Sequence, residues 1–156
     1  MSSKRVCVLG AGIIGSSLAI GLARLGYEVS VVERTTPRPG PSSFGIDVRS
    51  IAITPASKGF LASLGLWNET LAEPYRSMSI WEDQGVANLD FDSEEVGQTC
   101  LGWIVEAKKF QIDIWEKLNS EGVSKITDSP VALSMQEDSV ELSFNDKSLT
   151  FDFLVG

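Results

Sequence analysis

Residues 5 to 34 read RVCVLGAGIIGSSLAIGLARLGYEVSVVER, and this stretch decides the fold. An apolar segment at residues 6–9 leads into the glycine-rich sequence GAGIIG at residues 10–15. A segment long enough for a helix follows, and a second apolar segment at residues 29–32 ends at Glu33. Strand, glycine turn, helix and strand in this order predict a βαβ unit with a phosphate-binding turn.

The three glycines of the turn have separate physical tasks. Gly10 allows a sharp turn off the strand, through backbone angles that a Cβ would forbid. At Gly12 the missing side chain lets the backbone approach a diphosphate, and Gly15 permits close packing of the helix on the strand. The helix start also directs free N–H groups and the positive dipole end at the phosphates. We therefore expect a dinucleotide to be bound by the whole turn: Gly10, Ala11, Gly12, Ile13, Ile14 and Gly15.

Glu33 completes this pattern, because it lies 18 residues after Gly15, at the end of the second strand. An acid at about this spacing accepts hydrogen bonds from ribose hydroxyls. It favours an unphosphorylated ribose, which means FAD or NAD rather than NADP, and the turn alone does not choose between these two. An ordinary glycine-rich βαβ unit is the alternative, but it explains neither the acid nor the spacing of the glycines.

The helix after the turn has apolar residues at helical spacing. Ile14, Leu18, Leu22 and Leu25 predict one face that packs on a sheet. Gly26 is expected to end the helix as a C-terminal cap.

The composition excludes several function classes. The chain has 156 residues, a formal net charge of −8 and no histidine. The negative charge argues against nucleic acid as a partner, because phosphate contacts need clustered Lys and Arg. Without histidine there is no Ser-His-Asp triad and no imidazole base, so chemistry at this segment would come mainly from a cofactor. We nominate no catalytic residue and no metal ligand.

The termini and the two cysteines complete this description. The sequence MSSKRV leads straight into the first strand without a secretory signal, so we expect a cytoplasmic chain. Cys7 and Cys100 are interpreted as small buried apolar residues. The apolar run at residues 153–155 predicts a strand buried in a parallel sheet, and we expect the chain to be truncated there, with a genuine short protein as the alternative.

The rest of the chain predicts two further kinds of structure. After an irregular loop at residues 34–50, Thr54 and Pro55 are expected to open a helix over 56–64 that ends at Gly65, and a short helical piece is expected from Leu66. Strands at 77–81 and 87–91, with 101–105 as a third member, predict an inserted sheet. A helix at 107–119, a strand near 125–127 and an antiparallel meander over 131–153 are expected to follow.

Two blocks of sequence carry a family resemblance. Residues 47–67 read DVRSIAITPASKGFLASLGLW, and residues 101–118 read LGWIVEAKKFQIDIWEKL. Both resemble flavin-dependent aromatic hydroxylases, most nearly the ubiquinone-biosynthesis hydroxylases, and the likeness covers residues 4–156. It implies an α/β fold with a Rossmann-like FAD-binding domain, a β-meander and the start of an inserted antiparallel substrate sheet. The implied division is 1–76 and 106–156 for the FAD-binding domain and 77–105 for the partial substrate sheet.

The resemblance also implies cofactor contacts. Arg49 would lie near the flavin, Lys108 and Gln111 would face the FAD, and the Glu33-Arg34 pair would serve the adenosine ribose. The family usually has Arg where this chain has Lys108. Since Lys cannot make a bidentate guanidinium contact, a weaker or differently placed phosphate contact is implied.

The implied activity is a monooxygenase reaction. In the family, NAD(P)H reduces FAD, O₂ forms a flavin C4a-hydroperoxide, and a hydroxyl group passes to a polyprenylated phenol or quinol ring. Trp81, Phe91 and Trp103 would form part of the pocket wall. The partners implied are an aromatic or lipid-tailed substrate and O₂, with peripheral association of the full-length protein with the inner membrane or with a biosynthetic complex.

Three other readings stay open. An amine or amino-acid oxidase shares the opening βαβ unit, although the block at residues 49–67 argues against it. An NAD-dependent dehydrogenase would need further βα units soon after Glu33, where a long loop and an inserted sheet are expected instead. The last alternative is a non-catalytic dinucleotide-binding fragment.

Overall fold

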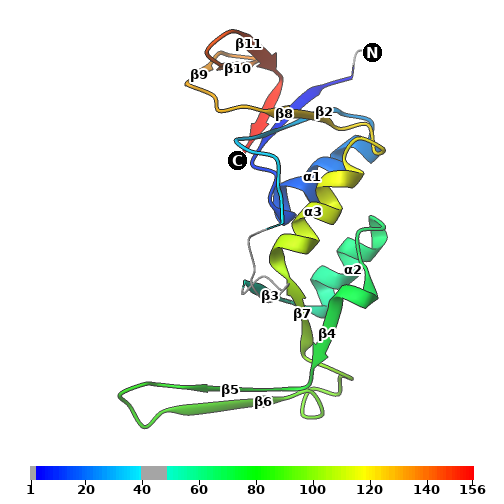
Figure 1. Cartoon of the computed structure of the whole chain (residues 1–156), viewed down its shortest axis with the longest axis vertical. Coiled ribbons are helices and arrows are strands. Elements are labelled where there is room, and N and C mark those ends of the chain that lie inside the picture. The colour runs from blue at the N-terminus through cyan, green and yellow to red at the C-terminus, as the bar shows by residue number, and fades with distance from the viewer. Residues whose placement is uncertain (1–2, 40–48) are drawn as a thin grey trace. The chain divides into compact units, whose positions relative to one another are not determined.

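The computed structural model describes residues 3–39 and 49–156, and the chain divides into two compact units (Figure 1). The first unit comprises Met1–Gly40 and Lys108–Gly156, and the second comprises Pro41–Ala107. The expected loop at 34–50 has no regular structure over residues 34–39, and its residues 40–48, with Asp47 of the resemblance block, lie outside the described residues.

A four-stranded parallel sheet forms the centre of the first unit, in the order β12-β1-β2-β8. Its strands are β1 (Arg5–Leu9), β2 (Glu28–Glu33), β8 (Ser124–Thr127) and β12 (Phe153–Val155). Val6 is opposite Val29 on one side and Phe153 on the other. The parallel pairing of β12 confirms that part of the prediction, but its expected burial is wrong. Phe153 is 51% exposed, because in the described chain β12 pairs only with β1 and forms an edge of the sheet.

The helix after β1 packs through small side chains. It is α1 (Ile13–Arg24), and it buries Ser16, Ser17, Ala19 and Ile20. The expected apolar face is wrong at its two ends, where Ile14 is 86% exposed and Leu25 is 76% exposed, whereas Leu18 and Leu22 between them are half-buried. Small residues on the buried face let the helix backbone lie close to the sheet, as the packing of Gly15 on β1 requires.

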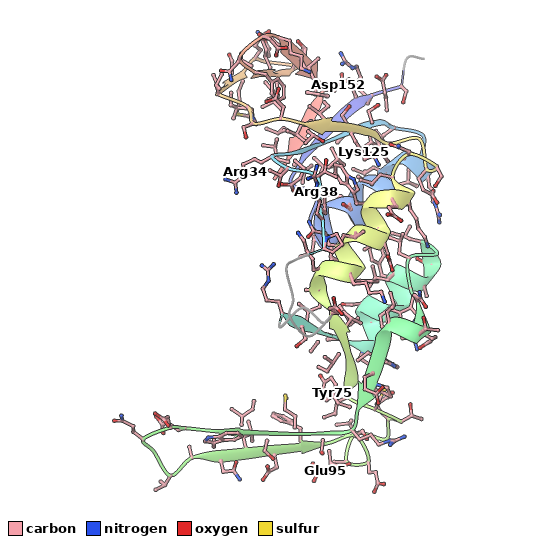
Figure 2. All side chains as sticks on the ribbon, in the orientation of Figure 1. Arg34, Arg38, Tyr75, Glu95, Lys125 and Asp152 are labelled. Carbon is pink, nitrogen blue, oxygen red and sulfur yellow. The ribbon has the colours of Figure 1, made fainter. Side chains whose placement is uncertain are left out.

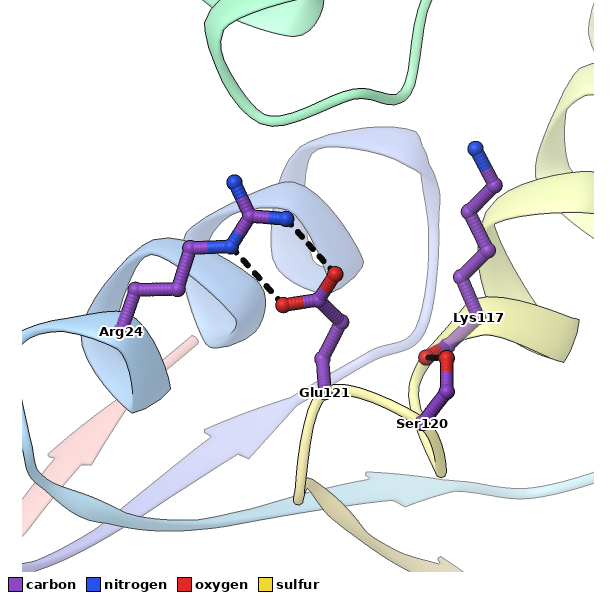
Figure 3. A network of polar contacts seen from close by, with 4 residues as sticks. All are labelled: Arg24, Lys117, Ser120 and Glu121. Atoms are coloured by element: carbon purple, nitrogen blue, oxygen red, sulfur yellow. Dashed lines mark hydrogen bonds and ion pairs between the residues drawn. The ribbon is translucent and has the colours of Figure 1, made fainter.

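Gly26 ends α1 as predicted. It has a φ of +91° and follows the last helical residues in a Schellman motif, in which Gly26 N–H donates to Ala23 C=O and Tyr27 N–H donates to Leu22 C=O. Arg24, in the last turn, also forms a two-point ion pair with Glu121, with N···O distances of 2.6 and 2.8 Å (Figure 3). This pair joins the end of α1 to the turn that follows α3 (Ala107–Lys117), where Ser120 Oγ donates to Lys117 C=O.

A β-meander covers one face of the parallel sheet. It consists of β9 (Ala132–Met135), β10 (Val140–Ser143) and β11 (Ser148–Phe151), in the order β11-β10-β9. Alternating side chains bring Leu142, Phe144 and Phe151 into one buried cluster with Cys7 and Val32 of the sheet. The predicted meander is therefore confirmed, except that Phe153 belongs to the parallel sheet. Phe110, Ile114, Trp115 and Leu118 of the α3 region are buried, as the spacing predicts.

The second unit contains a three-stranded sheet that the sequence did not indicate. Its strands are β3 (Ser50–Ile53), β7 (Gly102–Glu106) and β4 (Ala72–Tyr75), with β7 in the centre and antiparallel to both. The expectation that 101–105 joins the strands near 77–91 is therefore wrong. β7 pairs instead with β3, which lies about fifty positions earlier in the chain.

Helix α2 (Pro55–Ser63), which follows β3, confirms the helix predicted over 56–64. Thr54 caps it by accepting a hydrogen bond from Ser57 N–H, and Gly65, with a φ of +63°, ends it. The helical piece expected from Leu66 begins later, as the 3₁₀ helix η1 (Glu69–Leu71). Lys58 of α2 forms an ion pair with Glu69, and its Nζ lies 4.0 Å from the ring centre of Trp103.

The predicted hairpin consists of β5 (Ser77–Trp81) and β6 (Asn88–Asp92). Residues opposite each other in an antiparallel pair lie on the same face of the ribbon. One face therefore carries the pairs Met78–Phe91 and Ile80–Leu89, and the other carries Ser77–Asp92, Ser79–Asp90 and Trp81–Asn88. All four apolar side chains of the first face are exposed. Trp103 is not part of this ribbon, since it lies on β7 and contacts Trp67 edge to face.

No helix in the described ranges is long and apolar enough to cross a membrane.

Candidate dinucleotide-binding site

The glycine turn between β1 and α1 has the backbone geometry that its sequence predicts. Gly10 has a φ of +96°, in the region that favours glycine, and its N–H donates to Val32 C=O at 2.8 Å. A Cβ on Gly15 would overlap the carbonyl oxygen of Gly10 and press on the side chain of Val8. Gly10 is therefore required for the turn, and Gly15 is required for the contact between α1 and β1.

The peptide groups of Ala11 are held by side chains from two other elements. Ala11 N–H donates to the Glu33 carboxylate at 2.8 Å, and that carboxylate also accepts from Arg34 N–H at 3.0 Å. Ala11 C=O accepts a hydrogen bond from Gln111 Nε2 of α3 at 3.0 Å. The structure thus brings together Glu33, Gln111 and the glycine turn, although Gln111 is 100 positions away from Ala11 in sequence.

The start of α1 has backbone donors that make no bond within the helix. The first bond into the helix runs from Ser16 N–H to Gly12 C=O at 2.9 Å, so the N–H groups of Ile13, Ile14 and Gly15 precede the first intrahelical bond. Gly12 is the N-cap and has no side chain to cap them. A Cβ on Gly12 would meet no atom within 4 Å, so the space beside its Cα is open. Open space and free donors fit a diphosphate group.

The basic residues predicted to bind the cofactor lie on different elements of the structure. Arg34 is exposed directly after β2, and Arg38 lies on the same segment (Figure 2). Lys108 is half-buried in the first turn of α3. Arg49 belongs to the second unit, where its C=O accepts from Ala107 N–H at 3.0 Å, and its place near a flavin stays a prediction. The sequence did not indicate that Glu33 and Gln111 bind the turn itself. No local pattern could indicate the contact between Gln111 and Ala11, which are 100 positions apart.

The cysteine inside β1 offers no chemistry to this site. Cys7 is buried in the sheet, and burial raises its pKa to about 12. The thiolate is the nucleophilic form of cysteine, so a thiol that stays protonated at neutral pH is inert. This agrees with its interpretation as a small apolar core residue.

Comparisons with known proteins identify a family for this chain. A family model described as FAD dependent oxidoreductase matches residues 5–134. The 3-demethoxyubiquinol 3-hydroxylase of Escherichia coli (strain K12) is 34% identical over 142 residues, which are 88% of this chain and 36% of that protein.

Two solved structures share the fold. The 2,6-dihydroxypyridine-3-hydroxylase of Arthrobacter nicotinovorans has a TM-score of 0.69 at 20% identity, over 99% of this chain and 37% of that chain. A variant of HpxO from Klebsiella pneumoniae, complexed with FAD, has a TM-score of 0.67 at 22% identity, over 97% of this chain and 38% of that chain. The chain therefore spans little more than a third of the length of these proteins. Because the family model covers most of its length, the chain belongs to the FAD dependent oxidoreductase family.

Proposed function

We propose that this chain is the FAD-binding portion of a monooxygenase that hydroxylates a phenol or quinol ring in ubiquinone-type biosynthesis. The single observation that carries the binding role is the turn at Ala11, held by Glu33 and Gln111 beside the open space at Gly12. The identity to a ubiquinol hydroxylase supports the choice of reaction. A lipid-tailed aromatic substrate, O₂, NAD(P)H as reductant and peripheral membrane association all belong to this proposal.

Different residues of the site would bind different parts of the cofactor. Gly12, Ile13, Ile14 and Gly15 direct backbone N–H groups at the diphosphate, while Glu33 accepts from the adenosine ribose. Arg34, Arg49 and Lys108 supply positive charge to the cofactor. FAD, once bound, supplies the redox chemistry and the activation of O₂, and the protein binds it, orients it and excludes water.

The first experiment tests binding of the cofactor. The purified chain is mixed with FAD, freed of excess, and its visible spectrum recorded. We expect flavin bands for the wild type and none for Gly12→Val, whose side chain fills the space of the diphosphate. Gly12→Val should retain its unfolding temperature, because its Cβ meets no neighbour. Equal flavin content in both proteins would contradict the site, and a colourless wild type that binds NAD would favour a dehydrogenase.

A second experiment tests Glu33. Glu33→Gln replaces a charged acceptor by a neutral one, so ADP binding should weaken by about 1–2 kcal/mol. Isothermal titration with ADP measures this. Unchanged ADP affinity would remove Glu33 as the ribose ligand.

A binding role without turnover is the second candidate, and the coverage of about a third of each relative favours it. Oxidation of NADH or NADPH by the FAD-loaded chain, with a phenol present, separates the two. Consumption of reductant together with a hydroxylated product supports the monooxygenase, whereas flavin binding without consumption supports the binding role.

A further inference from the structure

We propose that Gln111 is a positioning residue, which fixes the peptide between Ala11 and Gly12 so that Gly12 N–H faces the ligand side of the turn. The inference rests on the proposed function, since it assumes that this side receives a diphosphate. The contact that motivates it is the hydrogen bond from Gln111 Nε2 to Ala11 C=O, at 3.0 Å and partly buried. A carbonyl oxygen only accepts, so the NH₂ side of the Gln111 amide must face it.

Because the peptide group is planar, this hydrogen bond also determines the direction of Gly12 N–H. The described residues contain no cis peptide bond, so Ala11 C=O and Gly12 N–H point to opposite sides of one plane. With the carbonyl directed at Gln111, Gly12 N–H is directed away from α3. Gly12 is exposed, and the space beside its Cα is open.

The turn needs such an anchor because glycine is permissive. Gly10 and Gly12 flank Ala11, and glycine adopts many backbone conformations at little cost. Glu33 fixes the preceding peptide through Ala11 N–H, and Gln111 fixes the following one through Ala11 C=O. Two consecutive peptide planes are thus set by side chains from β2 and α3 before any ligand arrives, which lowers the ordering cost of binding.

A direct contact between Gln111 and the flavin half of FAD makes a different prediction. Such a contact would act on FAD and leave ADP untouched. A positioning role acts on the diphosphate, which ADP and FAD share, so both ligands should lose the same factor.

The experiment compares Gln111→Met with Lys109→Met, an exposed position on the same helix that receives the same residue. Titration calorimetry with ADP and with FAD should give about tenfold weaker binding of both ligands for Gln111→Met, as expected for one lost hydrogen bond, and unchanged binding for Lys109→Met. Without ligand, the ¹H–¹⁵N signal of Gly12 should shift or broaden in Gln111→Met alone.

Three results would overturn the inference: unchanged ADP affinity, a loss confined to FAD, or an unmoved Gly12 signal. If Gln111→Met fails to fold, Gln111→Glu keeps the size of the side chain, still removes the donor, and decides the question by the same Gly12 signal. Failure of the proposed function looks different, because the wild type would then bind neither ADP nor FAD, and the ligand-free Gly12 signal would still test the anchor.

Discussion

The glycine turn and the β5–β6 hairpin are both local features with strong sequence signals, yet they are stabilised in different ways. The backbone of the turn is held by residues outside it, namely Val32 and Glu33 of β2 and Gln111 of α3. The hairpin is held by its own cross-strand pairs, and Met78, Ile80, Leu89 and Phe91 form an exposed apolar face.

Because of this difference, a substitution in the turn and one in the hairpin should disturb neighbouring atoms to different extents. An added Cβ at Gly15 meets the carbonyl oxygen of Gly10, whereas a side chain on the exposed face of the hairpin can change with little effect on packing. A two-stranded ribbon by itself is marginally stable in water. The backbone of the candidate site is therefore held by contacts between segments distant in sequence, whereas one face of the hairpin consists of exposed side chains.

The largest expected effect compares the same substitution on α1, the helix that follows the turn, and in the hairpin. Ile20→Ala leaves a cavity at a side chain of α1 that is 0% exposed, and should lower the free energy of unfolding by about 2–5 kcal/mol. Ile80→Ala, at a side chain 50% exposed in the hairpin, should cost less than about 1 kcal/mol. Urea unfolding of both variants measures the difference. Equal losses would break the comparison, because they would mean that the hairpin face is packed.

The next effect concerns the close contact under the turn. Gly15→Ala places a Cβ against the carbonyl oxygen of Gly10, so the backbone must shift, at a cost of about 1–3 kcal/mol. Gly21→Ala on the same helix meets no atom within 4 Å and should stabilise by roughly 0.5–1 kcal/mol. Thermal unfolding distinguishes the two, and a stabilised Gly15→Ala would contradict the close approach of α1 to β1.

The smallest expected effect depends on pH and concerns the ion pair between Arg24 and Glu121, which lies in neither of the two regions. The hydrogen bond from Arg24 lowers the pKa of Glu121 below its ordinary value of 4.5. The stabilisation is therefore present above pH 4.5 and is lost as the pH falls through the lowered pKa. Glu121→Gln should lower Tm by about 1–2 °C at pH 7 and by nothing near pH 2, because exposed pairs contribute little. A difference that persists at pH 2 would contradict this sign.

Local signals predicted the elements whose causes are local. The glycines of the turn, the cap at Thr54, the stop at Gly26 and the alternation in β10 each act within a few residues, and all are found in the structure. In β9 the side chains of Leu133 and Met135 are exposed, so the alternation there does not mark a buried face. The buried face of α1 was mispredicted, because apolar spacing draws attention to Ile14 and Leu25, while contact with the sheet requires small residues.

Contacts between segments distant in the chain could not be predicted from the sequence. Strands β3 and β4 are four residues each, and β4 contains Pro74, so neither has a clear strand pattern. Their pairing with β7 joins distant segments, and adjacency in sequence suggested the wrong neighbour for β7. In the candidate site, Glu33 follows from its spacing to the glycines, whereas the bond between Gln111 and Ala11 needs the three-dimensional arrangement of α3.

The pairing of β1 with β12 has a kinetic consequence. Val6 and Phe153 are neighbours in the sheet, so during synthesis the N-terminal strand leaves the ribosome long before this partner exists. Contacts over such separations close slowly, since the entropy of a long loop must be overcome first. The hairpin and the meander can form within moments of emerging, but one edge of β1 waits for residues 153–155. A nascent chain released early would leave that edge of β1 unpaired, and unpaired strand edges are prone to aggregation.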